Sequence, residues 1–257
     1  HGRAARGAGA LPLRAGLTMI LERVRGERFS RVLPLWRGLT VALLGGGPSL
    51  TLEQFELAGE ARHADRIRAI AVNDSYLLAP WADLHYAADA KWHQWHNEGI
   101  AKPLLHLTAA EVYGRWAAFP GQKCTIQNAG GHVVDESVHI LRNRDLATGP
   151  HAGLSDNPGA LATGRHSGFQ ALNLAILAGA STILLLGYDA KRGADGATHW
   201  HGEHIVTSPA EAAYAEFKRS FSSAQAAIEA AGVRVLNCSP NSSIDTFPKM
   251  SLKEALA

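Results

Sequence analysis

The sequence predicts an α/β protein with a mostly parallel sheet that is covered by helices on both faces. Three observations support this class: short runs that are apolar throughout, helix-compatible segments between these runs, and Gly, Asn or Asp where the runs end. Runs without apolar and polar alternation are typical of parallel strands that are buried on both faces. We expect a single domain over residues 19–257.

The first part of the chain predicts three strands. The segment "GLTVALLGGGPSL" (38–50) begins with aliphatic residues and breaks at three glycines, a proline and a serine before a helix-compatible segment from Thr51. This pattern predicts a strand, a tight loop and a helix. A second strand is expected in "IRAIAVNDSYL" (67–77), and a third in "ADLHYAADAKWHQWH" (82–96), ending near Asp89.

The middle of the chain, residues 97–163, is less regular. Short strands are expected in "KCTIQ" (123–127) and "GHVVDES" (131–137), whereas "TGPHAGLSDNPGALATG" (148–164) has the Gly, Pro, Asp and Asn content of loops. We therefore expect an irregular or lid-like segment here.

The last third returns to a regular pattern. Apolar residues on nearly every face of "SGFQALNLAILAGA" (167–180) predict a buried helix that stops at Gly179. The run "STILLLGYDA" (181–190) predicts a central strand. An amphipathic pattern over 208–232 predicts a long helix, and "VRVLNCSP" (233–240) predicts a final strand.

Composition limits the class of protein. Hydrophobic residues make up 46% and charged residues 19% of the 257 residues, which excludes a collagen-like or largely disordered chain. The net charge of +2 carries no specific nucleic-acid signal. The sequence leaves the oligomeric state open. Cys124 and Cys238 are too few for a disulfide framework, so we expect a cytoplasmic protein. No apolar run reaches the roughly 18–20 residues of a transmembrane span.

Residues 1–18 differ from the rest of the chain. They are rich in Arg, Gly and Ala and precede Met19, where a more structured pattern begins. We expect a disordered tail or a non-native extension and leave these residues out of the fold prediction.

Glycines and polar residues at strand ends predict a nucleotide pocket. Glycines after a strand permit a sharp turn and the close approach of a ligand, and the following helix N-terminus favours anions. Ligands of open α/β sheets bind beyond the carboxyl ends of the strands. The alternative is that these residues only cap helices and make turns. The candidate nucleotide-binding residues are Gly45, Gly46, Gly47, Ser49, Asn73, Asp74, Asp89, Ser167, Gly168 and Asp189.

The loop "THWHGEH" (198–204) holds three histidines and a glutamate. As a general base, a neutral histidine removes a proton from an attacking hydroxyl, and Glu203 would orient it. The spacing H-x-H-x-x-H matches no helical H-E-x-x-H arrangement and no further ligand group is apparent, so we assign no metal site. A polar loop without chemistry is the third explanation. Lys191 and Arg192 are candidates to neutralise a departing phosphate.

The aromatic run "KWHQWH" (91–96) has two explanations. Trp92 and Trp95 would stack on a base or a sugar, or they would form the core-facing stripe of a short helix, which their i, i+3 spacing favours.

In their order along the chain, these motifs resemble those of the bacterial lipooligosaccharide sialyltransferases. They resemble more distantly the phage and bacterial proteins with a domain similar to 6-hydroxymethylpterin pyrophosphokinase. The sialyltransferases carry a GNGPS-type loop, an Asn after the second strand, a T-S-G helix start, a G-x-D strand end, an H-x-x-G-H-type loop and a C-P-x-S segment. The counterparts here, over roughly residues 38–250, are "GGGPS" (45–49), Asn73 in "AVNDSY", "HSG" (166–168), "GYD" (187–189), "HWHGEH" (199–204) and "CSPNSSI" (238–244).

The resemblance implies a Rossmann-like glycosyltransferase fold that holds a cytidine nucleotide-sugar without a metal or other cofactor. It implies that residues 45–49 hold phosphate or ribose, that Asn73 and Ser167 contact the nucleotide, and that His204 deprotonates the acceptor hydroxyl. Because Glu203 is inserted relative to the family's G-H pair, His201 and His199 are further candidates for the base.

The sequence departs from this family at two places. Gly46 replaces the asparagine of the family's loop. The tyrosines that serve the leaving phosphate in the family have no match after Asp189, where Lys191 and Arg192 stand instead. These departures weaken the implication that the sugar is sialic acid.

We therefore expect a nucleotide-sugar-dependent glycosyltransferase with an inverting mechanism, a CMP-sugar as the implied donor and an unidentified hydroxyl acceptor. A Mg²⁺-dependent diphosphotransferase is the alternative enzyme, in which the acidic residues Asp74, Asp89 and Asp189 would carry the metal. A nucleotide-binding accessory protein without catalysis is the alternative from another class.

Overall fold

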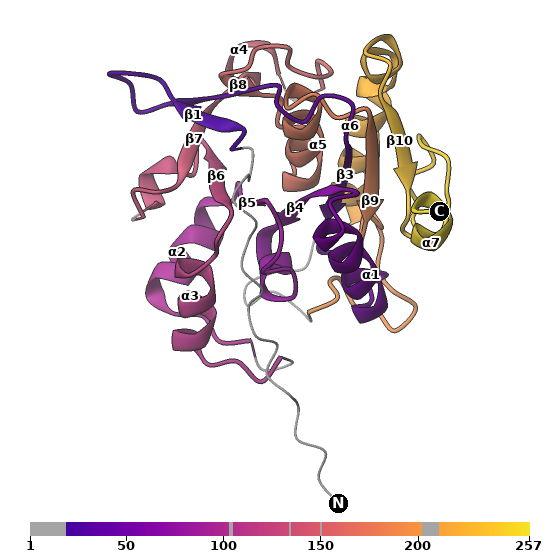
Figure 1. Cartoon of the computed structure of the whole chain (residues 1–257), viewed down its shortest axis with the longest axis horizontal. Helices are drawn as coiled ribbons and strands as arrows, with labels where there is room; N and C mark the ends of the chain where they lie inside the picture. The colour runs from indigo at the N-terminus through magenta and orange to yellow at the C-terminus, as the bar shows by residue number, and fades with distance from the viewer. Residues whose placement is uncertain (1–18, 103–104, 134, 150, 202–210) are drawn as a thin grey trace, which may run out of the picture.

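A computed structural model of the chain describes residues 19–102, 105–133, 135–149, 151–201 and 211–257. Within these residues an eight-stranded sheet, parallel throughout, forms the centre of the fold (Figure 1). Its order is β10-β9-β3-β4-β5-β6-β7-β8. The strands are β3 Thr40–Leu44, β4 Arg68–Val72, β5 Leu84–Tyr86, β6 Gln122–Ile126, β7 His139–Asn143, β8 Ala160–Leu161, β9 Thr182–Leu186 and β10 Arg234–Asn237.

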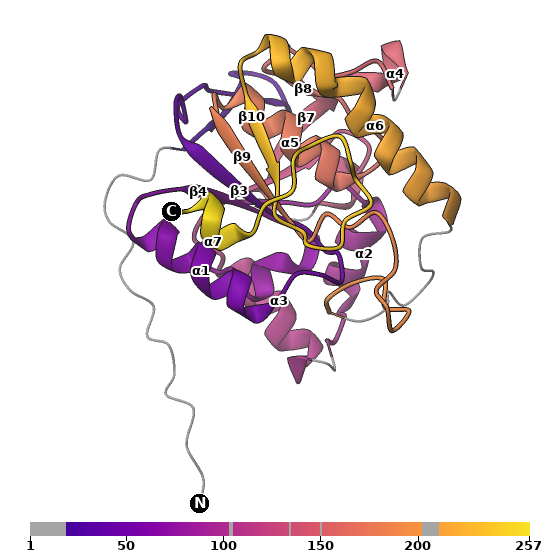
Figure 2. The ribbon, with the colours of Figure 1, turned by 90° about the vertical axis from the view of Figure 1, so that its right-hand side faces the viewer.

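Helices cover both faces of this sheet (Figure 2). On one face lie α1 Leu52–His63, α2 Ala90–Glu98, α3 Ala109–Ala117 and the short α7 Leu252–Ala255. On the other face lie α5 Ser167–Leu177 and α6 Glu211–Ala230. The predicted α/β, Rossmann-like class is therefore confirmed. The predicted start of the last long helix, at residues 208–210, lies outside the described residues.

The two-sided core explains why the strand segments are apolar at successive positions. In β3, Val41 and Leu43 pack into the core beneath α5 and α6, whereas Ala42 and Leu44 pack into the core beneath α1. All four side chains are fully buried. A strand with helices on both faces has no solvent side, so it has no position where a polar residue is favoured.

Smaller elements complete the described chain. The strands β1 Leu21–Arg23 and β2 Ser30–Val32 form an antiparallel pair that packs against β7. The other short elements are the 3₁₀ turns η1 Asn73–Leu77 and η3 Gly130–His132 and the helix α4 Asp145–Thr148.

The expectation of an irregular or lid-like segment over 97–163 is wrong in its main part, since this segment supplies β6, β7 and β8 of the sheet as well as α3. The strand expected at 131–137 is also misplaced, because β7 begins at His139. The strand expected at 123–127 is confirmed, because β6 spans Gln122–Ile126. Lys123 of β6 is buried, and its ammonium lies 2.7 Å from the carboxylate of Asp135, a tertiary pairing that local patterns do not reveal.

The strand order places a crevice at one point of the sheet. From β3 the chain moves through β4 to β8 on one side, and it then returns to β9 and β10 on the other side of β3. In open α/β sheets, ligands bind where the order reverses, beyond the carboxyl ends of the two strands concerned. Here these are the ends of β3 and β9, which are followed by the glycine turn and by Asp189.

Candidate functional site

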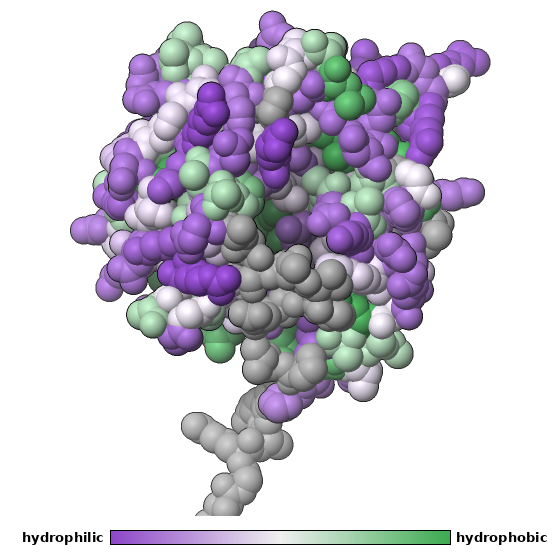
Figure 3. Space-filling view, turned by 180° about the vertical axis from the view of Figure 1, so that it is seen from behind, coloured by the Kyte–Doolittle hydropathy of each residue, from purple (hydrophilic) through white to green (hydrophobic). Residues whose placement is uncertain are grey.

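A cleft of about 900 Å³ lies beyond the carboxyl ends of β3 and β9. Its walls come from residues at or beyond the carboxyl ends of β3 to β9, from the start of α5 and from α6. This volume is within the range of small-molecule sites, roughly 300–1,000 Å³. In Figure 3, which views the molecule from behind, the surface is mostly hydrophilic and is hollowed near its centre.

Gly45, Gly46 and Gly47 all line this cleft. The backbone amides of Gly45 and Gly47, however, connect the end of β3 to the end of β9. The amides of Gly45 and Gly47 donate to the carbonyls of Leu186 and Gly187, each at 2.8 Å. A β-carbon on Gly47 would lie 2.1 Å from Oδ2 of Asp189, so only glycine permits this approach. The two amides are therefore committed to β9 and its turn and do not form a phosphate cradle.

The helix N-terminus that faces the cleft belongs to α5. Thr51 caps α1 through a complete capping box with Gln54, which satisfies these backbone groups internally. Ser167 and Gly168, at the start of α5, line the cleft instead. The helix N-terminus that borders the cleft is therefore that of α5 and not that of α1.

His166 caps α5 and lines the cleft beside these residues. Its Nδ1 accepts the amide of Phe169 at 3.2 Å. Burial lowers the pKa of His166 to about 3, so the ring is neutral and Nδ1 keeps the lone pair that the cap requires. A β-carbon on Gly168 would lie 2.8 Å from Cε1 of Tyr188, which explains a glycine at this position.

The segment that follows β9 supplies an acidic and a basic side chain, Asp189 and Lys191. Asp189 is 3% exposed, lines the cleft, and accepts the amide of Ser49 at 3.1 Å. Burial raises the pKa of this carboxyl. Lys191 also lines the cleft. Ser49 and Arg192 are not among the lining residues, and Arg192 donates to the carbonyl of Gly196 at 3.1 Å. Of the two predicted phosphate-binding cations, Lys191 therefore lines the cleft and Arg192 does not.

The histidine loop borders the same cleft. His199 is a lining residue, and its Nδ1 lies 2.9 Å from Oγ1 of Thr198. The amide of Trp200 donates to the carbonyl of Gly46 at 3.1 Å, which joins this loop to the glycine turn. His201 is buried behind the cleft, where its Nε2 lies 3.4 Å from Asp74. His204, the first candidate for the base, lies outside the described residues.

The residues after β4 and β5 separate into two groups. Asn73 and Asp89 line the cleft, and Asn73 has a left-handed backbone with a φ of 51°. Asp89 also caps α2, accepting the amide of Lys91 at 2.9 Å. Asp74 is corrected: its side chain is 1% exposed and does not line the cleft, because it accepts hydrogen bonds from Trp92 and Lys102 within the protein.

The aromatic run over 91–96 belongs to the core. Trp92 is buried and stacks on His96 with a ring separation of 3.6 Å. Its indole donates to Asp74 at 3.0 Å. The core interpretation of Trp92 is therefore confirmed.

The structure adds lining residues that the sequence did not indicate. One group surrounds the carboxyl ends of β6 and β7, where Asn143 donates to Asn128 at 2.7 Å. Asn143 was missed because the strand that it ends, β7, was expected at 131–137, whereas Asn128 follows β6, which was predicted within one residue. A second group forms an aromatic wall from β9 and α6. The added residues include Asn128, Asn143, Thr163, Arg165, Gln170, Tyr188, Tyr214, Phe217 and Phe221.

Tyr214 differs from the other aromatic residues of this wall. It is 6% exposed, and its hydroxyl has no hydrogen-bond partner among the described residues. Burial raises the pKa of this phenol, so it keeps its proton. A buried hydroxyl without a partner costs free energy, and a ligand in the cleft would supply the acceptor.

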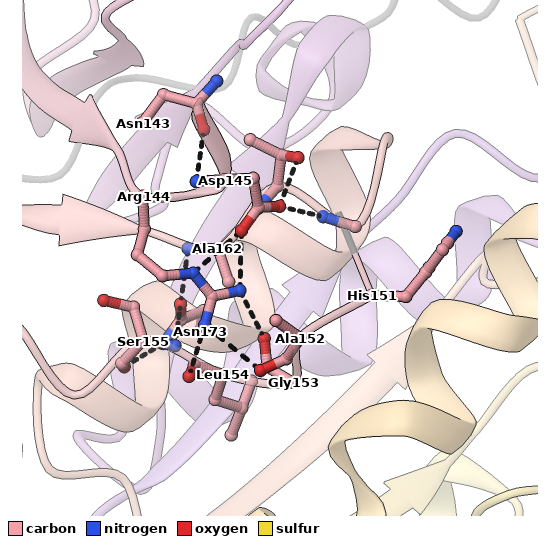
Figure 4. A network of polar contacts seen from close by, with 12 residues as sticks. Asn143, Arg144, Asp145, His151, Ala152, Gly153, Leu154, Ser155, Ala162 and Asn173 are labelled. Atoms are coloured by element: carbon pink, nitrogen blue, oxygen red, sulfur yellow. Dashed lines mark hydrogen bonds and ion pairs between the residues drawn. The ribbon is translucent and has the colours of Figure 1, made fainter. Parts of the chain in front are cut away.

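A polar network holds the wall that carries Thr163 (Figure 4). The guanidinium of Arg144 contacts Oδ1 of Asp145 at 2.6 Å and donates to the carbonyls of 152–154. The other oxygen of Asp145 accepts the amide and hydroxyl of Thr163 at 2.7 and 2.6 Å. One carboxylate thus joins the end of β7 to the segment that enters α5.

The arrangement of carboxylates bears on the magnesium alternative. Within the described residues, no group of three or more His, Cys, Asp or Glu side chains is placed to hold a metal ion. Asp74 is held by Lys102, while Asp89 and Asp189 line the cleft.

No helix among the described residues is long and apolar enough to cross a membrane.

Comparisons with known proteins give one structural likeness. No family model and no curated protein matches this sequence. The chain is similar to the solved structure of MAf glycosyltransferase from Magnetospirillum magneticum AMB-1, with 15% sequence identity and a TM-score of 0.48. The match covers 84% of this chain and 34% of the other, so the chain spans about a third of that protein.

Proposed function

We propose that this protein is a glycosyltransferase that moves a sugar from a nucleotide-sugar to an acceptor hydroxyl. One observation carries the proposal: His199, the glycine turn and the start of α5 border a single cleft where the strand order reverses. A cleft of this kind presents a basic imidazole and an anion-binding helix terminus to one bound donor.

The donor's phosphate is assigned to the start of α5. Ser167 and Gly168 present the positive end of the helix, Lys191 adds a charge, and the protonated Tyr214 adds a hydrogen-bond donor. These groups stabilise the negative charge that develops on the leaving phosphate. The aromatic wall of α6 and the amides of Asn73, Asn128 and Asn143 are assigned to the base and the sugars.

Among the described histidines, His199 is assigned as the base. In the tautomer in which Nδ1–H donates to Thr198, the basic lone pair is on Nε2. The acceptor oxygen then attacks the anomeric carbon while its proton passes to Nε2 of His199. The bond from the anomeric carbon to the phosphate oxygen breaks, and its electron pair stays on the phosphate. A single displacement of this kind inverts the anomeric configuration. His204 remains an alternative base.

The finer assignment is a sialyltransferase-like enzyme that takes a CMP-sugar without a metal. It rests on the resemblance of the motifs at 45–49, 166–168, 187–189 and 199–204. The magnesium-dependent alternative would use Asp89 and Asp189, the two acidic residues of its proposed set that line the cleft. The accessory-protein alternative would use the same cleft for binding alone.

A thermal-shift screen with CMP, CDP, UDP, GDP and ATP, each with Mg²⁺ or with EDTA, tests this proposal. A nucleotide at 100 times its dissociation constant adds about 2.7 kcal/mol to the stability of the folded state. Stabilisation by CMP in EDTA supports the CMP-sugar transferase, and release of CMP from a CMP-sugar in the presence of hydroxyl acceptors would then show turnover. Stabilisation by ATP only with Mg²⁺ supports the diphosphotransferase. No stabilisation by any nucleotide contradicts the proposal.

A further inference from the structure

A charged cluster lies inside the protein behind the cleft. Its centre is Asp74 of η1, whose side chain is 1% exposed. One carboxylate oxygen accepts the indole N–H of Trp92 at 3.0 Å. The other accepts the ammonium of Lys102, which is itself only 7% exposed, and lies 3.4 Å from Nε2 of His201. Asp74 thus joins η1, α2, the segment after α2 and the histidine loop.

This carboxylate is ionised under all ordinary conditions. Burial by itself raises the pKa of Asp74, but the neighbouring His201, Lys102 and His96 outweigh burial and hold the pKa well below its usual range. An ionised carboxylate in a buried position attracts an N–H group in a fixed direction. Nε2 of His201 is therefore held toward Asp74.

Each of three successive loop residues has a different anchor. His201 is held at Asp74, and the ring of Trp200 packs edge-on against Phe55 with a centroid distance of 5.4 Å. The ring of His199 is stacked on that of His201, with a centroid distance of 5.1 Å and an interplanar angle of 22°. The orientation of His199 at the cleft therefore depends on the ring behind it.

We propose that Asp74 is a positioning residue that sets the orientation of His199 at the cleft by holding His201. Asp74 contacts no substrate in this arrangement. This inference rests on the proposed function for its effect on turnover, but the orientation of the His199 ring is a property of the protein alone. The sequence predicted nucleotide contact or a metal for Asp74, and its location behind the loop assigns this different role.

The test compares two buried aspartates changed in the same way. Asp74→Asn preserves shape and removes the charge that holds His201. Asp83→Asn is the matched control, because Asp83 is also buried and is paired with Arg62 at 2.6 Å. It precedes β5 and accepts the amide of Ala69, which places it at the amino ends of the strands, away from the cleft.

The expected result is a fall in kcat of roughly 10- to 100-fold for Asp74→Asn, as small misplacements of catalytic groups produce. The KM for the donor should stay within about twofold, since nucleotide binding does not use His201. The Asp83→Asn variant should keep the kcat of the unchanged protein. Equal kcat values for the two variants would overturn the proposal.

A second variant protects the test against misfolding. Asp74→Asn leaves the Lys102 ammonium buried without its partner, which is costly. The double change of Asp74→Asn with Lys102→Met removes both charges together and still releases His201. The same loss of kcat is expected, and retention of full activity would also overturn the proposal.

Imidazole NMR separates this inference from the proposed function. Long-range ¹H–¹⁵N spectra report the tautomer of each histidine. The imidazole signals that are absent from the spectrum of the His199→Gln variant belong to His199. We expect its signals to move or broaden in both Asp74 variants and to stay unchanged in Asp83→Asn. If no sugar is transferred at all, the proposed function fails while these signals still decide the positioning role. Unchanged His199 signals in the Asp74 variants would contradict it.

Discussion

His199 packs against Gly46: a β-carbon built on Gly46 would lie only 3.2 Å from Cδ2 of the His199 ring. Gly46 follows β3 directly and His199 lies in the loop beyond β9, and these two parallel strands are neighbours in the sheet. Their contact brings the glycine turn and the histidine loop to the same rim of the cleft. A transferase site requires this arrangement, because the glycine turn and the histidine loop must border the same cleft.

The base assignment predicts the kinetics of His199→Gln. Without the imidazole, transfer should fall by roughly 10²–10⁴-fold while nucleotide affinity stays nearly constant. Initial rates with a saturating donor, together with nucleotide titrations of the same variant, measure the two quantities. A variant with unchanged kcat would remove His199 from the mechanism and leave His204 as the base.

Gly46 and Gly47 should respond differently to substitution. Gly46→Val adds bulk beside the His199 ring at the rim of the cleft, so we expect weaker nucleotide binding and little change in melting temperature. Gly47→Ala places a β-carbon 2.5 Å from the backbone oxygen of Gly187, so we expect a clear loss of stability. Thermal melts and nucleotide titrations of both variants test this difference. Equal melting temperatures would contradict the account of the strand junction.

Tyr214→Phe should separate stability from binding. The hydroxyl has no partner among the described residues, so its removal should leave the free protein as stable as before or more stable. Loss of a hydrogen bond to a charged phosphate costs roughly 1.5–3 kcal/mol, so nucleotide affinity should fall about 10-fold or more. Tyr113→Phe, at a side chain that is 40% exposed, is the control. Equal affinities in both variants would exclude Tyr214 from the binding site.

The network in Figure 4 predicts a structural role for Asp145. Asp145→Asn removes a carboxylate that is 5% exposed and is paired with Arg144, and breaking a buried pair costs roughly 3–5 kcal/mol. Glu22→Gln breaks a surface pair with Arg31, which is worth at most about 1 kcal/mol. Urea unfolding of both variants measures the difference. A cost for Asp145→Asn no larger than that for Glu22→Gln would show that the network does not hold the cleft wall.

Stability should fall in mild acid because several histidines have a pKa lowered by burial, and His85 is one of them. This ring is buried, donates from Nε2 to the carbonyl of Asn73 at 3.0 Å, and accepts the indole of Trp116 at Nδ1. Burial lowers its pKa to about 3. Below the unfolded value of about 6.5, the unfolded chain binds a proton that the folded chain does not, so stability is lost as the pH falls toward 3.

Melting temperatures between pH 7 and pH 4 measure this effect. In His85→Gln the dependence of stability on pH should decrease by about one proton, whereas His63→Gln, at an exposed position, should retain the full dependence. The same dependence in His85→Gln and in the unchanged protein would mean that His85 is not the group responsible.

Much of the sheet could be predicted from local sequence. β3, β4, β9 and β10 are continuous apolar runs that end in Gly, Asn or Asp, because strands covered on both faces have no solvent side. β6 could also be predicted, because the strand expected at 123–127 overlaps it, but β7 was expected at 131–137 and lies at 139–143. The lining residues Asn128 and Asn143 could not be predicted, because which residues beyond the strand ends face the cleft depends on the packing of the whole sheet.

The sequence by itself determined the α/β class, the glycine turn, and the polar residues that end the strands, because the pattern of apolar residues and the backbone preferences of Gly, Asn and Asp are local properties of the chain. Only the tertiary structure decided which candidate site residues line the cleft and which are buried away from it. It placed Asn73 at the cleft and Asp74 behind it, although the two are adjacent in the chain. Side chains of successive residues point in different directions, and which direction meets the cleft depends on the strands and helices packed around them.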